Sequence, residues 1–251
     1  MPLRRIKGKL IKGKAMLKHP VLKRYIPEFH ALKPGVRTQM MKRYHTLFIK
    51  PDKGSQGKGI VRLKKLKNGK VQISLGLRHT VVKKFYVKNT LTQLLHPKKT
   101  YLIQQGLKLA KYKNRLIDIR VFMQKPNDRW LISGRVVRIG AAGRFTTNYH
   151  QGGQPETLEV VLRSIYKNQP KKINPTIRSL DRICTMTARV LDRRFPGIRQ
   201  LGIDVAIDSN GRLWIIEANT NPAFLTFKNL KDKTMYYRIL RRRRYIYSKY
   251  R

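Results

Sequence analysis

Apolar and polar residues alternate on both sides of a turn near the end of the chain. Two runs rich in valine, isoleucine and tryptophan, residues 201–207 and 212–219, flank the turn-forming residues 208–211, Asp-Ser-Asn-Gly. A cluster of this kind between two β-branched runs predicts a β-hairpin. We therefore expect two antiparallel strands over this stretch.

The register of this hairpin decides which side chains share a face. An even-length loop would pair Ile207 with Arg212 and would set Gly202 opposite Glu217, leaving room beside that carboxylate. Because side chains alternate along a strand, one face is polar. The polar face carries Asp204, Glu217 and Asn219. The other face is apolar and carries Ile203, Val205, Ile207, Trp214, Ile216 and Ala218.

The polar face of the hairpin offers hard oxygen ligands. Mg²⁺ takes such carboxylate and carbonyl oxygens together with substrate phosphates. An ordinary solvated face is the alternative interpretation. Only 12 of the 251 residues are acidic, and two of them fall on this small patch, which favours a functional role.

Similar patterns predict the other elements. Strands are expected at 46–50, 60–66, 70–88, 101–106, 117–122 and 130–139. Helical spacing over 173–195, with Asn174-Pro175 at its start and Pro196-Gly197 at its end, predicts a long helix. Asn89 is expected to cap a short helix that Pro97 ends.

A glycine-rich loop follows the strand that ends in Lys50. Its residues are Gly54, Ser55, Gln56, Gly57, Lys58 and Gly59. The backbone N–H groups of such a loop can wrap phosphate oxygens, although a plain turn remains an equal alternative. It is not a Walker A loop, because the spacing and the closing Lys-Ser/Thr pair are absent.

Further candidate groups lie at strand ends. Gln104 and Gln105 end a strand that could offer backbone groups to a flat heterocycle, and a simple connector is the alternative. Alternation places Asp118 and Arg120 on one face, where an ordinary solvated ion pair is the alternative interpretation. Asn148 precedes a Gly-Gly turn that would let the backbone approach an anion or a metal closely.

The charge of the chain is extreme. Lysine and arginine number 58 against 12 acids, which gives a net charge of +46 and predicts salt-dependent attraction to polyanions. The single cysteine, Cys184, excludes an internal disulfide framework and is expected to be buried. No run approaches a membrane span, and the first residues lack the apolar core of a signal peptide, so we expect a soluble intracellular protein.

The segment 228–251 interleaves ten basic residues with five tyrosines. Arginine and tyrosine together can contact phosphates and stack on bases. The favoured interpretation is a surface helix through about Leu240, followed by a frayed, solvated tail that associates with a polyanion.

Seven short segments, taken in order, resemble the ATP-grasp superfamily and, more narrowly, its YheC/YheD group, described as endospore coat-associated. The resemblance extends over about residues 7–227. The segments that carry it are Phe48-Ile49-Lys50-Pro51, the loop 54–59, Tyr101-Leu102-Ile103-Gln104-Gln105, Asp118-Ile119-Arg120, Asn148 with Gly152-Gly153, Gly202-Ile203-Asp204, and Glu217-Ala218-Asn219.

The resemblance implies ATP and Mg²⁺ held between two α+β subdomains. Lys50 would contact the α- and β-phosphates, the loop 54–59 would close as a lid, and Gln104 and Gln105 would lie at the hinge that holds adenine, with Leu107 in the same nucleotide-binding set. Positions facing the γ-phosphate or an acyl phosphate are matched by Arg120, Arg138 and Asn148. Metal-ligand positions are matched by Asp204, Glu217 and Asn219.

We therefore expect four parts: a basic helical segment 1–45, a small lid subdomain 46–105, a large subdomain 106–230 with the metal site, and a basic tail 231–251. The implied function is an ATP-dependent carboxylate–amine ligase of a bacterial cytoplasm, forespore or spore coat. The alternative is a structural spore protein that binds polyanions or nucleic acid on this scaffold with little or no turnover.

Overall fold

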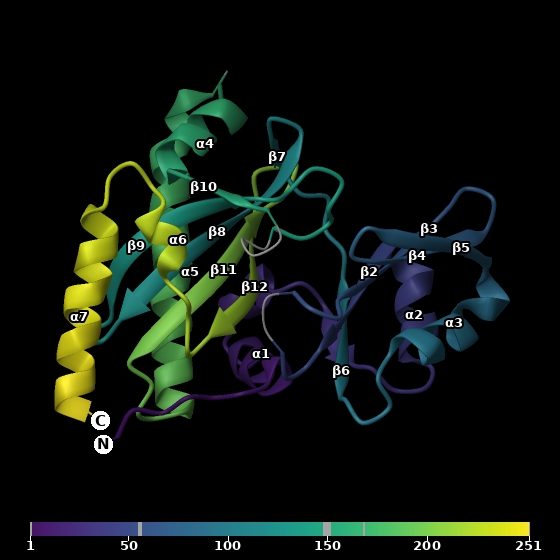
Figure 1. Cartoon of the computed structure of the whole chain (residues 1–251), viewed down its shortest axis with the longest axis horizontal. Helices are drawn as coiled ribbons and strands as arrows, with labels where there is room; N and C mark the ends of the chain where they lie inside the picture. Colours follow the sequence, from purple (N-terminus) through teal and green to yellow (C-terminus); the bar gives the residue numbers. More distant parts are fainter. Residues whose placement is uncertain (1, 55–56, 148–151, 168, 251) are drawn as a thin grey trace.

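The computed structural model describes residues 2–54, 57–147, 152–167 and 169–250, which form two lobes, each built on an antiparallel sheet (Figure 1). The small sheet has the order β1-β6-β2-β3-β4-β5. Its strands are β1 (Phe29–Ala31), β2 (Thr46–Pro51), β3 (Val61–Lys65), β4 (Lys70–Leu75), β5 (Arg78–Lys83) and β6 (Tyr101–Gln105).

The large sheet has the order β10-β9-β8-β11-β12, and β7 pairs with β8 beside this path. Its strands are β7 (Lys111–Tyr112), β8 (Arg115–Gln124), β9 (Leu131–Ile139), β10 (Gln154–Glu156), β11 (Gln200–Ile207) and β12 (Leu213–Asn219). The α-helices are α1 (Lys9–Leu17), α2 (Val36–Arg43), α3 (Val87–Leu94), α4 (Leu158–Ile165), α5 (Ile173–Arg194), α6 (Leu225–Lys228) and α7 (Thr234–Tyr250). Short 3₁₀ turns are η1 (Leu22–Tyr25), η2 (Lys84–Tyr86) and η4 (Pro170–Lys172).

Each lobe has its own hydrophobic core. Helices α2 and α3 cover one face of the small sheet, where Met40 and Leu91 pack with Leu47, Leu63 and Ile103. The large sheet is covered on both faces. Helices α1, α4 and α5 contribute to the larger core, and α6 and α7 pack on the opposite face through Phe227, Leu230 and Ile239.

Most of the predicted elements are confirmed. The strands expected near 46–50, 60–66, 101–106, 117–122 and 130–139 are present, and the long helix is α5. The run 70–88 is instead two strands joined at Gly76, and its last residues are helical. The expected cap at Asn89 is wrong, because α3 begins at Val87 and its N-cap residue Tyr86 makes no side-chain capping bond.

The predicted register of the β11–β12 hairpin is also wrong. Ile207 pairs with Leu213, so the loop has five residues, and Asp208 stabilises it by accepting N–H bonds from Asn210 at 2.9 Å and Arg212 at 3.0 Å. A β-bulge between Asp204 and Val205 then shifts the pairing once more.

The five-residue loop changes which residues at the start of β12 face the core. Leu213 and Ile215 are buried in the core of the large lobe, whereas Trp214 and Ile216 lie outside it and are partly exposed. The predicted apolar face is therefore wrong at Trp214 and Ile216. It is confirmed for the remaining members, Ile203, Val205, Ile207 and Ala218.

The C-terminal segment differs most from expectation. Helix α7 continues to Tyr250 rather than fraying after Leu240, because Ile239 and Ile246 are fully buried against the large sheet. Arg242 also donates to Ser133 Oγ at 2.9 Å. The N-terminal segment likewise belongs to the lobes, since β1 extends the small sheet and α1 packs on α5 and β12.

The cysteine and the helices were also subjects of predictions from the sequence. Cys184 is buried in the core of the large lobe, as predicted. No helix in the described part of the chain combines the length and apolar character needed to cross a membrane. The four-part division of the chain stays a prediction.

Candidate functional site

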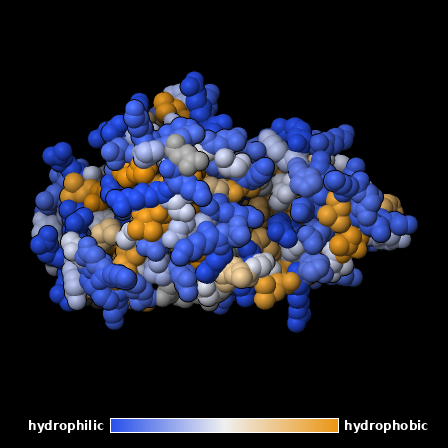
Figure 2. All heavy atoms as spheres, turned by 90° about the horizontal axis from the view of Figure 1, so that it is seen from above, coloured by the Kyte–Doolittle hydropathy of each residue, from blue (hydrophilic) through white to orange (hydrophobic). Residues whose placement is uncertain are grey.

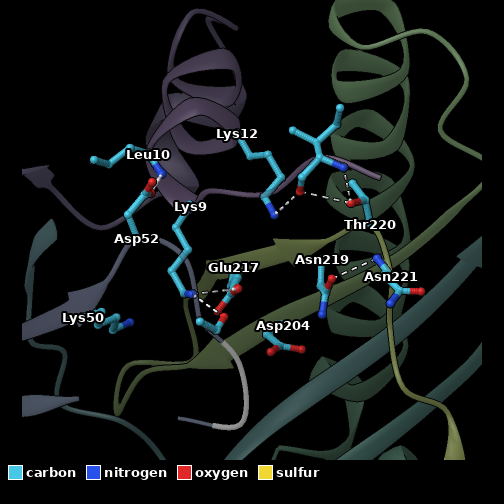
Figure 3. A network of polar contacts seen from close by, with 12 residues as sticks. Lys9, Leu10, Lys12, Lys50, Asp52, Asp204, Glu217, Asn219, Thr220 and Asn221 are labelled. Carbon is cyan, nitrogen blue, oxygen red and sulfur yellow. Dashed lines mark hydrogen bonds and ion pairs between the residues drawn. The ribbon is translucent and has the colours of Figure 1, made fainter. Parts of the chain in front are cut away.

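Polar side chains from both lobes meet where β2 and β6 face β12, beside the first turn of α1 (Figure 3). A cavity lies at this junction. Its lining includes Lys9, Lys12, Lys50, Gln104, Ile216 and Glu217. The site is therefore assembled from elements that are distant in sequence.

Lys50 projects from β2 toward this junction. Strand pairing places Phe48, Lys50 and Gln104 on the same face of the small sheet, and the Lys50 ammonium donates to Gln104 Oε1. Burial lowers the pKa of Lys50 to about 8, although the carboxylates of Glu217 and Asp204 act in the opposite direction. A lysine in this state carries its proton at neutral pH but holds it weakly.

Helix α1 brings two more lysines to the cavity. Lys9 Nζ donates to the carbonyl oxygen of Gly54 at 2.9 Å and lies 3.6 Å from Glu217 Oε1. Lys12 is buried, donates to the Ile6 carbonyl at 3.2 Å, and has its pKa lowered by burial. Asp52 fixes the start of the helix, because its carboxylate accepts the Leu10 N–H at 2.7 Å.

Lys9 and Lys12 are not among the site residues predicted from the sequence. The only signal in this region is the expected basic helical segment 1–45, which does not distinguish these two lysines among 58 basic residues. The packing of α1 against β12 brings these two lysines to the cavity.

Two arginines converge on Asp204. Arg120 makes a two-point ion pair with this carboxylate, and Arg138 reaches its Oδ2 at 2.9 Å. Arg138 also makes two bonds of 2.6 Å to Asp118, whose Oδ2 accepts from the Thr147 hydroxyl. Asp118 and Arg120, which were predicted to share a face, thus belong to one continuous ionic network with Arg138 and Asp204.

The network keeps its members charged. Burial opposes ionisation of Asp204, but Arg120 and Arg138 outweigh it and hold the pKa of this carboxyl below its ordinary value. Burial likewise acts to lower the pKa of Arg138, whereas Asp118 and Asp204 raise it above the usual range. A glycine is required at position 202, beside Arg120. A Cβ there would lie 2.6 Å from Pro222 Cβ and 3.0 Å from Arg120 Nη1.

The oxygen donors on β12 fit a hard divalent cation. Glu217 lies opposite Asp204 across the strand pair, and its side chain is 30% exposed. Asn219 follows two residues later on the same face and accepts the Asn221 N–H at 2.9 Å (Figure 3). Among the described residues no three His, Cys, Asp or Glu side chains form a metal cluster. One or two carboxylates with substrate phosphates are what Mg²⁺ ordinarily uses.

Comparison with known proteins identifies the fold and the family. The model of the YheC/D-like ATP-grasp family matches residues 5–250. The chain belongs to this family. Both the family and the ATP-grasp α+β fold predicted from the sequence are confirmed.

The ATP-grasp chain is similar to two curated proteins of Bacillus subtilis strain 168. It is 27% identical to the endospore coat-associated protein YheD over 197 residues, which are 74% of this chain and 41% of YheD. It is 26% identical to the endospore coat-associated protein YheC over 248 residues, or 92% of this chain and 64% of YheC. The chain thus spans less than two thirds of either relative.

A solved structure shares the fold. The crystal structure of the D-cycloserine synthetase DcsG superposes with a TM-score of 0.56 at 9% sequence identity, covering 95% of this chain and 70% of that one. At this identity the likeness concerns the ATP-grasp fold alone.

Within this ATP-grasp chain, the predicted site residues fall into three groups. The structure brings together Lys50, Gln104, Arg120, Arg138, Asp204, Glu217 and Asn219. The side chain of Gln105 is not part of this group. Its Oε1 accepts the Glu28 N–H at 3.2 Å. Leu107 is partly buried in the connection between the lobes.

The glycine-rich loop is only partly described. Gly54 contacts Lys9, Lys58 is exposed, and Gly57 and Gly59 have φ of +66° and +72°, a left-handed conformation that favours glycine. Ser55, Gln56 and Asn148 lie outside the described residues.

Proposed function

We propose that this chain binds ATP with Mg²⁺ between its two sheets and uses it to activate a carboxylate as an acyl phosphate for attack by an amine. The observation that carries the proposal is the junction of the lobes, where Lys9, Lys50 and Glu217 line one cavity beside the arginine network. Membership of the ATP-grasp family supports it.

The cationic side chains would hold the triphosphate. Lys50 and Lys9 would contact the phosphate chain, and the loop that begins at Gly54 would close over it. Arg120 and Arg138 would face the transferred phosphoryl group, and Asp204 keeps both guanidinium groups oriented. Preorganised charges of this kind stabilise phosphoryl transfer without covalent participation of the protein.

Glu217 and Asn219 would hold the divalent cation. When bound, that cation neutralises charge on the phosphate oxygens and orients them. Asp204 as a third ligand stays a prediction, because in this structure both of its oxygens accept from arginines.

The proposed reaction has two transfers. An oxygen of the substrate carboxylate attacks the γ-phosphorus, the bond from that phosphorus to ADP breaks, and ADP leaves with the electron pair. The amine nitrogen then attacks the acyl carbon, phosphate leaves, and the nitrogen loses a proton. The protein contributes positioning, charge and exclusion of water.

We further propose a role in spore formation. It is supported only by the two relatives whose names describe them as endospore coat-associated.

ADP release tests the enzymatic proposal. The chain is mixed with ATP, Mg²⁺ and a panel of carboxylates and amines, and ADP is measured by a coupled assay. We expect release that depends on one carboxylate and is abolished by Glu217→Gln. The matched control is Glu159→Gln, an exposed position on α4, which should leave release unchanged.

Nucleotide binding is tested separately by thermal unfolding. ATP should raise the midpoint only when Mg²⁺ is present, and Glu217→Gln should remove the Mg²⁺-dependent part. No shift at millimolar ATP would contradict the proposal. A shift without ADP release across the panel would instead support binding without turnover.

A further inference from the structure

The two faces of the small sheet differ in what covers them. Strand pairing puts Leu47, Leu63 and Val71 on the face that packs against α2 and α3. The opposite face, here called the open face, carries Arg62 and Lys64 on β3, Lys70, Gln72 and Ser74 on β4, and His79, Val81 and Lys83 on β5. In the described structure no helix packs on this face.

The open face begins at the cavity and runs outward. Its inner end is Phe48 on β2, which contacts Phe145 of the large lobe at 6.0 Å between ring centroids, and Arg62 lies over the same Phe145 ring at 4.9 Å. Beyond Arg62 the side chains of Lys64, Lys70 and Lys83 are exposed. The face is therefore a strip open to solvent.

The charge of the strip is unbalanced. Residues 53–117 contain 17 lysines and arginines and no aspartate or glutamate. Lys70 and Lys83 are direct cross-strand partners, and like charges in this arrangement repel each other. A bound polyanion would relieve that repulsion, so charge complementarity points to an anionic polymer.

Two exposed aromatic residues follow β5, the outermost strand of the small sheet. Phe85 is 85% exposed and Tyr86 is 53% exposed, and their rings meet edge to face with centroids 5.5 Å apart. Both residues lie in η2, and Lys83 and Lys84 directly precede them in the sequence. Figure 2 views the molecule from the side on which β3, β4 and β5 lie in Figure 1, and the small lobe there is mostly hydrophilic with separate hydrophobic areas.

We propose that the open face and the Phe85–Tyr86 pair together bind single-stranded nucleic acid. The lysines would contact successive phosphates, and unpaired bases would stack on the exposed rings. A duplex offers no free base faces for such stacking, and an acidic peptide has no repeated planar rings. This function is separate from ATP binding, because none of the exposed lysines named here reaches the cavity.

The test uses the full chain and a fluorescein-labelled oligothymidine of about 20 nucleotides, with binding followed by anisotropy over a series of salt concentrations. We expect Phe85→Ala to weaken binding about ten-fold through lost stacking. Lys64→Gln with Lys83→Gln should lower the slope of log K against log salt by about 1.4, the value for two phosphate contacts.

A matched set on α7 controls for general charge. Tyr237→Ala removes an aromatic side chain that is 62% exposed, and Arg241→Gln with Arg244→Gln removes the same two charges from an exposed helix face. These variants should leave affinity within about two-fold and the salt slope nearly unchanged. Circular dichroism verifies that every variant is folded.

Three outcomes overturn the proposal. Equal losses in the two sets would show attraction to net charge alone. No loss in the small-sheet set would exclude this face. Tighter binding to phosphatidylglycerol vesicles, polyglutamate or a duplex of the same length, with the same dependence on Phe85, would assign the surface to another partner.

Discussion

Asp204 on β11 lies directly opposite Glu217 on β12, yet the two carboxylates have different partners. Asp204 is held by Arg120 and Arg138, whereas Glu217 lies 3.6 Å from Lys9. The first is buried in an ionic network, and the second is partly exposed beside the cavity. The two acids should therefore respond differently to substitution.

Asp204→Asn should mainly reduce stability. It leaves the buried Arg120 guanidinium without its paired carboxylate and leaves Arg138 with Asp118 alone, and breaking a buried pair in this way costs about 3 kcal/mol or more. Urea unfolding measures the loss. Asp181→Asn is the matched control, since Asp181 pairs with Arg135 in the same two-point manner but is 30% exposed, and its loss should be about 1 kcal/mol or less. Equal losses would contradict the anchoring role.

The affinity for ATP should depend on the protonation of Lys50. Because its pKa is lowered to about 8, the side chain is almost fully protonated near pH 6.5 and loses its proton above pH 8. The dissociation constant of ATP should be flat below about pH 7 and should then rise, approaching about ten-fold per pH unit. Titration calorimetry at several pH values measures this. Lys50→Arg stays charged and should flatten the profile, so parallel profiles for the two proteins would refute the assignment.

The same lysine should affect stability with a defined sign. Its pKa in the folded state, about 8, lies below the ordinary value of 10.5, so the unfolded chain binds more protons between these two values. The contribution of Lys50 to the free energy of unfolding therefore rises with pH over that interval. Lys50→Met should remove this rise, as measured by unfolding at pH 7.5 and about pH 10.

Lys9→Ala should weaken ATP binding without unfolding the chain. The substitution removes the 2.9 Å bond to Gly54 and a cation facing the proposed phosphate site, and a bond to a charged group contributes about 1.5–3 kcal/mol. We expect the dissociation constant to rise at least ten-fold by calorimetry. Lys14→Ala, on an exposed position of the same helix, should change it little. Similar effects of the two substitutions would place Lys9 outside the site.

Helix α7 should behave as part of the core. Ile246→Ala creates a cavity beneath it and should cost about 2–5 kcal/mol in urea unfolding, because Ile246 is fully buried. Tyr245→Ala, at the neighbouring residue with a 42% exposed ring, should cost about 0.5 kcal/mol or less. A small effect of Ile246→Ala would restore the expectation of a frayed tail.

The strands and the long helix could be predicted because their cause is local. Alternation over Ile117–Phe122 and the helical spacing that ends at Pro196-Gly197 are properties of short windows, and β8 and α5 follow them. The order of the short motifs likewise sufficed for the ATP-grasp family. The polar face of Asp204, Glu217 and Asn219 was predicted even though the register was wrong, since the five-residue loop and the bulge compensate for each other.

By itself, the sequence determined the α+β elements, the family and most of the residues gathered at the candidate site. Tertiary structure alone decided that Lys9 meets Glu217, that Asp204 is held by two arginines, and that α7 is buried. The physical reason is distance along the chain. Alternation and helical spacing report on neighbours within a few residues, whereas these contacts join residues 66 or more positions apart and depend on tertiary packing.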